Sequence, residues 1–276
     1  MDPPAADRVV LVTGANSGIG LATVLEVARR GFRTVATVRS VAKARGVRAA
    51  ARAAGVRIAT VQLDVTDAEA CRKVVARVRP WGLVNNAGTS FTGAVEDVGD
   101  DEARRAFEVM VLAPMRLARL SVPHMRAAGG GRIVNLSSIY GIATTPLSGW
   151  YQAAKHALEA VSDALRAEVA RDGIAVVLVE PGGFRTGIWG EADDDLGRRT
   201  DSRYDAAYRR TRFGIRLTDP LLGSPERVAR VIGDALVTRR PKPRYLVGLD
   251  AMALGLATRF VPAQAWDLVT RRALGL

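Results

Sequence analysis

Two side chains that could transfer a proton lie four residues apart in one helical stretch. Tyr151 and Lys155 belong to YQAAKHALEAVSDALRAEV, and this spacing places both side chains on one face of a helix. A free tyrosine has a pKa of about 10, so moving it to near 7 requires roughly 4 kcal/mol. A neighbouring ammonium group favours the phenolate. The pair is a candidate acid–base centre for a carbonyl or alcohol oxygen.

A serine is expected to assist this pair. Ser138 precedes Tyr151 by 13 residues, directly after the predicted strand Arg132–Leu136. Its hydroxyl would hydrogen-bond the same substrate oxygen and orient it. Ser137 is the alternative, but the alternation along the strand end and the S-x-x-G spacing to Gly141 favour Ser138.

A glycine-rich turn, TGANSGIG at Thr13–Gly20, lies between the first predicted strand and the first predicted helix. Gly14 allows a tight turn, Gly18 lets the backbone approach a phosphate, and Gly20 lets the helix pack closely. The helix N-terminus adds unpaired N–H groups for a pyrophosphate. A turn without ligand is the alternative, which the strand–turn–helix context disfavours. The residues expected to contact a dinucleotide here are Gly14, Asn16, Ser17, Gly18, Ile19 and Gly20.

The residue after the second predicted strand distinguishes the two nicotinamide cofactors. An NAD site usually carries a carboxylate there for the ribose hydroxyls, whereas this chain reads Val38-Arg39-Ser40. An arginine suits a 2′-phosphate. We therefore predict NADP(H) in preference to NAD(H), the alternative being that Arg39 is a solvated surface side chain.

The elements that must position these residues alternate between strand and helix. Short, continuously apolar runs are typical of strands buried on both faces of a parallel sheet. We predict one α/β domain over residues 1–276, a Rossmann-type doubly wound parallel sheet with helices on both faces and right-handed crossovers. The predicted strands are Arg8–Val12, Thr34–Val38, Arg57–Leu63, Gly82–Asn85, Arg132–Leu136 and Ala175–Glu180, and the first helix is Leu21–Arg30.

The composition changes after the sixth strand. Gly, Asp, Arg and Tyr are concentrated between Gly182 and Gly223, and we expect a substrate lid over about 184–223. Within it, Glu191–Asp195 and Gly197–Thr200 are typical of a mobile, charged surface segment. Beyond it, Ser224 as N-cap and Pro225 at the first position predict an amphipathic helix. A C-terminal extension over about 244–276 holds a possible strand, Arg244–Gly248, and a helix, Pro262–Leu274.

Bulk composition excludes several classes of protein. Hydrophobic residues make up 48% of the 276 residues, enough for a sizeable core. The single cysteine, Cys71, cannot form an internal disulfide, and no secretory signal or membrane-spanning run is apparent, so we expect a cytoplasmic chain. The net charge of +12 comes from scattered arginines, which favours no nucleic-acid partner. His124 and His156 lack metal-ligand spacing, so no metal is expected.

Taken together, the motifs resemble the short-chain dehydrogenase/reductase family. They follow the family's order: TGANSGIG, LDV (Leu63–Val65), NNAG (Asn85–Gly88), SSIYG (Ser137–Gly141), YQAAK (Tyr151–Lys155) and PGGFRT (Pro181–Thr186). The resemblance implies a catalytic trio of Ser138, Tyr151 and Lys155, with Lys155 also holding the nicotinamide ribose and Ser17 assisting at the 2′-phosphate. The further cofactor residues it implies are Asp64, Val65, Asn86, Ala87, Gly88, Pro181, Gly182 and Thr186.

The substrate class is inferred from the same resemblance. GWYQAAKHALEAVSDALR resembles the hydroxysteroid and retinol dehydrogenase branch. Phe184, Ile188 and Trp189 would then form an apolar wall beside Ser138, for a small apolar or cyclic ketone or alcohol. The alternative is that these three side chains only pack the lid. The resemblance also implies a homodimer or homotetramer, formed through helices around Arg104–Met125 and Trp150–Asp172.

One residue departs from the family pattern. The family usually carries F-x-V-N-V after NNAG, with an asparagine that holds a water linking the lysine to solvent, but this chain reads Phe107-Glu108-Val109-Met110-Val111. Methionine donates no hydrogen bond. A non-redox or otherwise non-standard biosynthetic enzyme on the same scaffold is therefore an alternative. A nucleotide-binding sensor, and a peripheral membrane protein using the basic helix around Trp266, are further alternatives.

Overall fold

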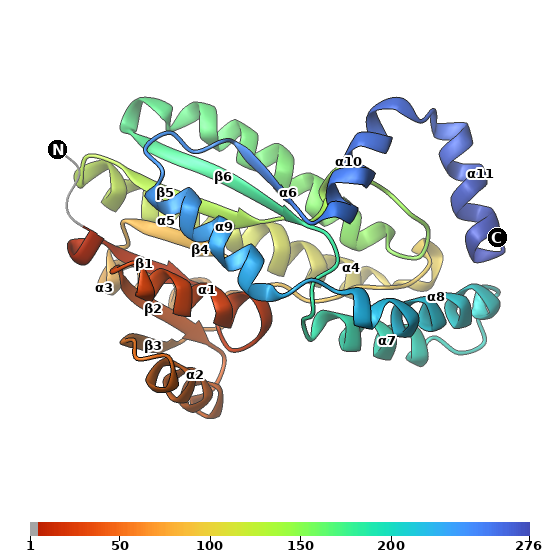
Figure 1. The fold of residues 1–276 in the computed structure, drawn as a ribbon, viewed down its shortest axis with the longest axis horizontal. Coiled ribbons are helices and arrows are strands. Elements are labelled where there is room, and N and C mark those ends of the chain that lie inside the picture. Colours follow the sequence, from red (N-terminus) through yellow and green to blue (C-terminus); the bar gives the residue numbers. More distant parts are fainter. Residues whose placement is uncertain (1–4) are drawn as a thin grey trace.

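A seven-stranded parallel sheet forms the centre of the computed structural model, which describes residues 5–276 (Figure 1). The strands are β1 (Val9–Val12), β2 (Arg33–Val38), β3 (Ile58–Gln62), β4 (Gly82–Asn85), β5 (Gly131–Leu136), β6 (Ile174–Pro181) and β7 (Arg244–Val247). Their order is β3-β2-β1-β4-β5-β6-β7. The six strands expected from apolar runs, and the possible seventh, are all present. The Rossmann-type prediction is confirmed.

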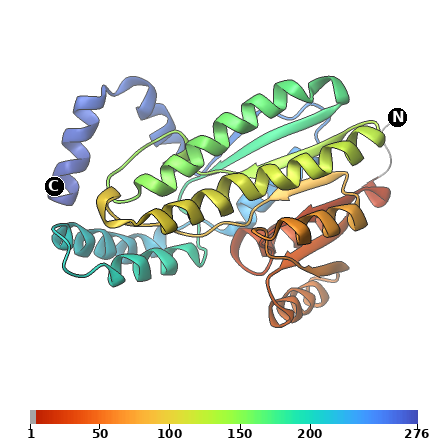
Figure 2. The same cartoon turned by 180° about the vertical axis from the view of Figure 1, so that it is seen from behind.

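Helices cover both faces of this sheet. One face packs against α1 (Gly18–Arg29), α2 (Val41–Ala53) and α9 (Pro225–Val237), through a core that includes Val24, Val47 and Ile232. The other face, toward the viewer in Figure 2, packs against α3 (Ala68–Val78), α5 (Ala113–Ala127) and α6 (Gly149–Glu168). Strands buried on both faces explain why their sequences are continuously apolar rather than alternating.

Local capping sets several of the helix starts. Ser40 accepts a hydrogen bond from the Lys43 N–H at the start of α2, and Asp67 accepts from the first turn of α3. Helix α9 begins at Pro225 after Ser224, as predicted, although the Ser224 hydroxyl donates to Glu226 and caps no backbone group. The helix after β4 begins as α4 (Asp100–Phe107) and continues into α5 through a π-helical stretch, Glu108–Leu112.

The segment after β6 differs from the prediction. Residues 191–195 lie in helix α7 (Ile188–Arg198), which packs against α8 (Asp205–Thr218), with Leu196 and Tyr208 buried. The expectation of a mobile, charged surface segment is wrong here, because Asp193 forms ion pairs with Arg212 and Arg216 of α8.

The chain ends in two further helices, α10 (Leu249–Phe260) and α11 (Ala263–Leu274). They extend from β7 and lie across from α7 and α8 at one end of the molecule (Figures 1 and 2). No helix within residues 5–276 is both long and apolar enough to cross a membrane.

Candidate active site

A cavity of about 1190 Å³ lies at the carboxyl ends of the central strands. The strand order reverses between β1 and β4, and ligands of doubly wound sheets bind at such a switch point. Every site residue predicted from the sequence lines this one cavity, from Gly14 in the first turn to Trp189 in α7. The sheet thus brings together motifs that are up to 175 positions apart in the chain, counted from residue 14 to residue 189.

The glycine turn has the shape expected of a phosphate cradle. Gly14 and Gly18 have φ angles of +64° and +51°, a region that favours glycine. A side chain on Gly20 would collide with the carbonyl oxygen of Gly14 and the side-chain amide of Asn86. On Gly18 it would lie 3.0 Å from the Thr186 methyl carbon, which places the PGGFRT segment against the turn. The backbone at the N-terminus of α1 is therefore open to a phosphate group.

The NNAG segment, which begins at the end of β4, is hydrogen-bonded to this turn. The Asn86 side-chain amide donates to the carbonyl oxygens of Thr13 and Gly14, at 2.9 and 3.1 Å. The Thr13 hydroxyl oxygen accepts from the backbone N–H groups of Asn86 and Ala87, both at 3.0 Å. Thr13 was not predicted to have a role. The sequence did offer a signal for this role, because Thr13 directly follows β1 and is the first residue of the glycine motif.

Cationic groups gather at the adenosine end of the cavity. Arg39 is exposed, and the cavity wall also includes Lys43 from the first turn of α2 and Arg105 from α4. Hydrogen bonds from Thr66, together with Arg39 and Arg105, hold the pKa of Asp64 below its usual value. Lys43 was missed by the sequence analysis, although it follows the Arg39-Ser40 pair by less than one helical turn. This arrangement fits an anionic group near the ribose.

The three candidate catalytic side chains meet where β5 ends beside α6. The Lys155 ammonium donates to the Leu136 carbonyl oxygen at 2.8 Å, and its Nζ lies 5.7 Å from the centroid of the Tyr151 ring. The Ser138 hydroxyl accepts from the Tyr140 N–H at 3.2 Å and also hydrogen-bonds Tyr151. A substrate oxygen and the ribose of a cofactor could therefore both lie close to these three side chains.

Burial governs the protonation of this pair. Burial raises the pKa of Tyr151 to about 12, partly offset by the hydrogen bond from Ser138. Burial also lowers the pKa of Lys155 to about 8, opposed by the negative charge of Glu159. From the sequence, the neighbouring ammonium was expected to lower the pKa of the phenol toward 7. In the structure the Lys155 Nζ is directed to a backbone carbonyl oxygen instead. The Tyr151 hydroxyl is accordingly protonated at neutral pH. The alternative serine, Ser137, is buried with no hydrogen bond from its hydroxyl.

Met110 lies in the π-helical stretch that joins α4 to α5. Its side chain is 1% exposed and packs in a cluster with Phe91, Ala154 and Tyr151. The position at which the family carries its asparagine therefore lies in a π-helical stretch, not in a regular α-helix. A π-helical turn inside an α-helix is common at functional sites. An apolar thioether occupies the place where an amide would be expected.

The predicted apolar wall is formed by the segment after β6. Phe184 is buried in the core, whereas Ile188 and Trp189 are half-buried, and all three line the cavity. The Trp189 indole N–H donates to the Phe184 carbonyl oxygen at 2.8 Å. Phe184 also packs the segment itself, since a side chain on Gly223 would lie 2.6 Å from its ring. Both alternatives from the sequence analysis thus apply to Phe184.

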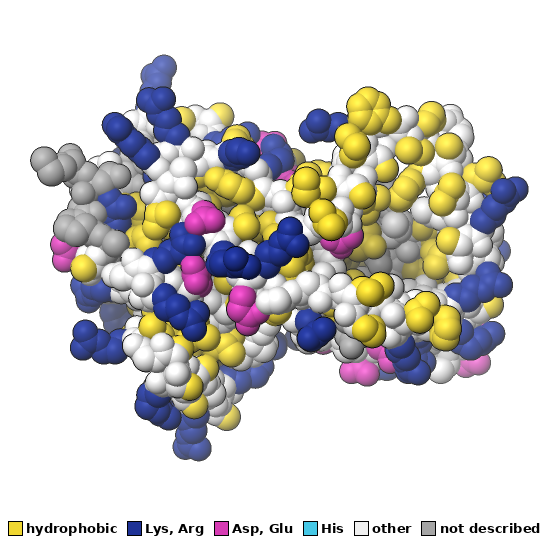
Figure 3. All heavy atoms as spheres, viewed as in Figure 1, with side chains coloured by type: hydrophobic (Ala, Val, Ile, Leu, Met, Phe, Trp, Pro, Cys, Tyr) yellow, Lys and Arg dark blue, Asp and Glu magenta, His cyan; other side chains and the backbone are white. Residues whose placement is uncertain are grey.

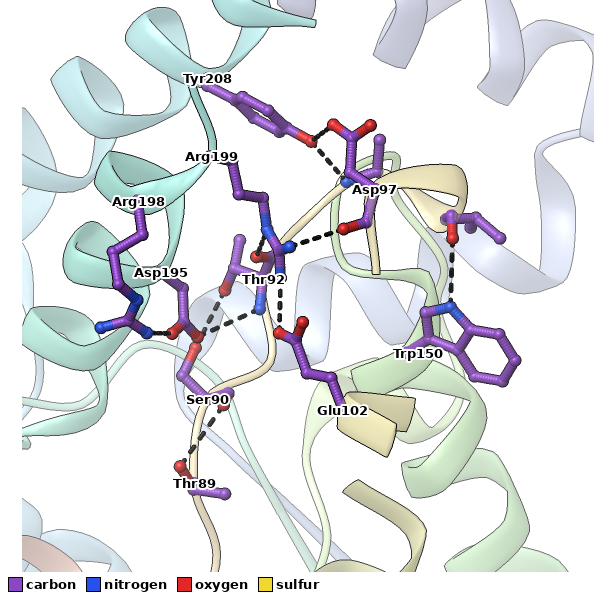
Figure 4. Close-up of polar contacts among 12 residues, drawn as sticks. Thr89, Ser90, Thr92, Asp97, Glu102, Trp150, Asp195, Arg198, Arg199 and Tyr208 are labelled. Carbon is purple, nitrogen blue, oxygen red and sulfur yellow. Dashed lines mark hydrogen bonds and ion pairs between the residues drawn. The ribbon is translucent and has the colours of Figure 1, made fainter. Parts of the chain in front are cut away.

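The loop after β4 is held against α7 and α8 by polar contacts (Figure 4). The Arg199 guanidinium donates to the carbonyl oxygens of Thr92 and Asp97, both at 2.8 Å, and to Glu102 at 2.5 Å. The Tyr208 hydroxyl donates to the Asp97 carboxylate and accepts from a backbone N–H of the loop. These contacts hold Thr92 and Glu102, two residues that line the cavity.

A second buried charged cluster lies one turn beyond Lys155. Glu159 of α6 and Glu180 of β6 face each other, with Glu180 only 1% exposed. Arg244 of β7 lies 3.0 Å from Glu159 and 3.2 Å from Glu180, and also pairs with Asp163. Burial and the facing Glu159 raise the pKa of Glu180 to about 8, although Arg244 opposes this. Neither glutamate was predicted from the sequence to have a role in the site.

This cluster predicts an unusual dependence of stability on pH. The folded chain keeps a proton on Glu180 up to about pH 8, whereas the unfolded chain releases it near pH 4.3. The proton on Glu180 therefore contributes to the free energy of unfolding at low pH, and this contribution is lost as the pH rises from about 4.3 to about 8. Glu180→Gln stays neutral, so we expect its melting temperature to gain on the native chain progressively from pH 5 to pH 8.

Thermal melts at several pH values test this expectation. Glu168→Gln, an exposed glutamate on the same helix as Glu159, is the matched control and should follow the native chain at every pH. A difference between Glu180→Gln and the native chain that is constant with pH would show that Glu180 is ionised in the fold.

Among the described residues there is no group of three or more His, Cys, Asp or Glu side chains that could hold a metal ion. Cys71 is buried, and burial raises the pKa of its thiol, which makes it a poor nucleophile.

The fold and this cavity define a dinucleotide-binding oxidoreductase scaffold. The family model for the short chain dehydrogenases matches residues 8–197, and the chain belongs to that family. It is 30% identical to the NADPH-dependent 3-dehydrocapnine reductase of Ornithobacterium rhinotracheale, over 95% of each chain. It is 31% identical to human retinol dehydrogenase 5, over 96% of this chain and 88% of the relative. A short-chain dehydrogenase from Streptomyces avermitilis superposes with a TM-score of 0.78 at 33% identity, over 96% of this chain and 97% of that one. The family prediction, including retinol dehydrogenase-like relatives, is confirmed.

Proposed function

We propose that this enzyme is an NADP(H)-dependent oxidoreductase that interconverts a ketone and a secondary alcohol, with Tyr151 as the acid–base group. The observation that carries the proposal is the meeting of Ser138, Tyr151 and Lys155 on the same cavity as the glycine turn. The open backbone around Gly14 and Gly18 fits a dinucleotide phosphate.

Each residue then has a separate task. A bound nicotinamide supplies or accepts the hydride. Tyr151 donates its proton to the carbonyl oxygen during reduction, and its raised pKa keeps that proton on the hydroxyl until the transfer. Ser138 hydrogen-bonds the same oxygen and orients it. Lys155, fixed by the Leu136 carbonyl oxygen, binds the nicotinamide ribose and favours the phenolate that remains.

The preference for NADP(H) rests on charge at the adenosine end. Arg39 and Lys43 would contact a 2′-phosphate, with Ser17 adding a hydroxyl from the glycine turn. No carboxylate follows β2, so the usual partner of the NAD ribose is missing there. The NADPH dependence of the 3-dehydrocapnine reductase, a relative that aligns along nearly the whole chain, supports the same preference.

Calorimetric titration of the purified protein with NADPH and NADH tests the cofactor assignment. We expect tighter binding of NADPH, and Arg39→Ala should weaken it roughly 10- to 100-fold through loss of a charge-assisted hydrogen bond. Arg52→Ala, an exposed arginine of α2 outside the cavity, is the control. A preference for NADH would refute the role of Arg39 but keep the enzyme, and binding of neither cofactor would refute the proposed function.

The substrate we propose is small and apolar or cyclic. Phe184, Ile188 and Trp189 supply apolar surface beside Ser138, and the segment 184–223 acts as the lid over it. We further propose that residues 1–276 form one domain, that the enzyme acts in the cytoplasm, and that it associates as a homodimer or homotetramer. The helices around 104–125 and 150–172 would form the contact.

Met110 favours a second candidate function, a non-redox or otherwise non-standard reaction on the same scaffold. Its buried thioether cannot hold a water that links Lys155 to solvent. Loss of a positioned proton-transfer group can slow a reaction by about 10²–10⁴-fold. Absorbance at the nicotinamide band distinguishes the two, because ketone reduction consumes NADPH and a non-redox reaction leaves it unchanged.

A further inference from the structure

Large apolar side chains are exposed along one side of helix α10. They recur at intervals of three or four positions, which places them on a single helix face. None of them packs in a described core cluster, and Phe260 is 76% exposed. These side chains are Leu249, Met252, Leu256 and Phe260. Exposed apolar surface on this scale marks an interaction site in a folded protein.

The pattern continues on α8, on the short turn that follows it, and on α11. Phe213 and Leu217 of α8 are exposed, and Leu221 is 83% exposed. Leu268 and Val269 of α11 are exposed as well. Figure 3 shows these apolar side chains gathered over one half of the molecule, where α8, α10 and α11 lie. We call these five side chains, together with the four of α10, the apolar face.

Two side chains of the apolar face border the active-site cavity. Leu221 and Leu249 are both strongly exposed and line the cavity. They belong to the segments on its two sides, the turn after α8 and the start of α10. Whatever covers the apolar face therefore lies directly against the opening through which a substrate enters.

The charged side chains beside the apolar face indicate what kind of partner it binds. Arg209 and Arg216 are exposed on α8, four positions before and three positions after Phe213, and Arg216 also pairs with Asp193. Arg259 is exposed on α10, three positions after Leu256. Anionic lipid headgroups would complement these arginines. Leu and Phe on one side with arginines at the border is the pattern of helices that lie in a membrane interface.

We propose that the apolar face docks the enzyme on an anionic lipid surface, with the mouth of the cavity turned toward the bilayer. Arginine side chains at the border would reach the headgroups while their neighbours enter the acyl region. Docking itself does not depend on the reaction. Delivery of an apolar ketone or alcohol from the bilayer into the cavity rests on the proposed function.

Vesicle flotation of the full chain tests this proposal. The probes are vesicles of phosphatidylcholine alone and vesicles in which one lipid in three is phosphatidylglycerol. We expect binding to the anionic vesicles that weakens as salt is raised, and little binding to phosphatidylcholine alone. Leu256→Glu combined with Phe260→Glu should weaken binding roughly tenfold or more. Neither residue lines the cavity, so the NADPH affinity of the double variant should be unchanged. A native chain that floats with anionic vesicles but binds no NADPH would refute only the proposed function.

The matched control is Val237→Glu, which places the same charge at an exposed apolar position at the end of α9. It should float with the anionic vesicles like the native chain. Native chain that fails to float would overturn the proposal, as would equal loss in the control. A native dimer in light scattering that the double variant dissociates would instead identify the apolar face as a contact between two copies, and would also overturn it.

Discussion

Tyr151→Phe is expected to lower kcat by about 10²–10⁴-fold on a ketone substrate, while NADPH still binds. The hydroxyl that the substitution removes is the only part of the side chain that can give a proton to the carbonyl oxygen. Its raised pKa keeps that proton in place at neutral pH. Steady-state kinetics with NADPH oxidation as the signal, together with cofactor titration, separates loss of chemistry from loss of binding.

Tyr245→Phe is the control for this experiment. The Tyr245 hydroxyl accepts a hydrogen bond from the Lys242 N–H at 3.0 Å and lies outside the cavity, so the substitution removes a phenol without touching the site. Undiminished turnover in Tyr151→Phe would assign the acid–base role to another group. A ligand response that survives in a chain without measurable turnover would instead favour a nucleotide sensor.

The strands and the glycine turn could be predicted because their causes are local. A strand buried on both faces must be apolar throughout, as in Val9–Val12, and a phosphate turn needs glycine where φ is positive, as at Gly14. The same holds for Tyr151 and Lys155, because a helix fixes the relation between positions four apart. For these residues the three-dimensional neighbourhood follows from the sequence nearby.

The rest depends on contacts between distant segments. The charged stretch 191–195 forms a helix because Asp193 pairs with Arg212, and Glu191 accepts from Thr89, about a hundred positions away. Such pairs leave no periodic signal in the sequence. Charge alone therefore suggested a mobile segment where the fold has a cavity wall.

The buried glutamates illustrate the same limit at a finer scale. Glu159 follows Lys155 by four positions, so its place on the catalytic face of α6 was open to prediction. Glu180 meets it because α6 packs against β6, and the register of β6 with β7 then places Arg244 beside both glutamates. The pKa of Tyr151 also depended on geometry, since the Lys155 ammonium is directed to a carbonyl oxygen of β5.

Gly20→Ala is expected to lower the affinity for NADPH by about 10²-fold. The added methyl group would collide with the carbonyl oxygen of Gly14 and the side-chain amide of Asn86. Gly14 is part of the turn and the Asn86 amide is hydrogen-bonded to it, so the start of α1 must move away from the phosphate cradle. A displacement of about 1 Å can cost on the order of 10²-fold in a positioned site, and overpacking destabilises by about 1–3 kcal/mol. Calorimetric titration with NADPH and a thermal melt measure both effects.

Gly46→Ala is the matched control, because a methyl group there meets nothing within 4 Å on helix α2. Replacing glycine by alanine inside a helix stabilises it by roughly 0.5–1 kcal/mol, so this variant should melt slightly higher and bind NADPH normally. The two substitutions make the same chemical change, and their opposite outcomes would isolate the close approach at the turn from the general effect of glycine in a helix. Normal NADPH binding in Gly20→Ala would mean that the dinucleotide does not sit on the N-terminus of α1.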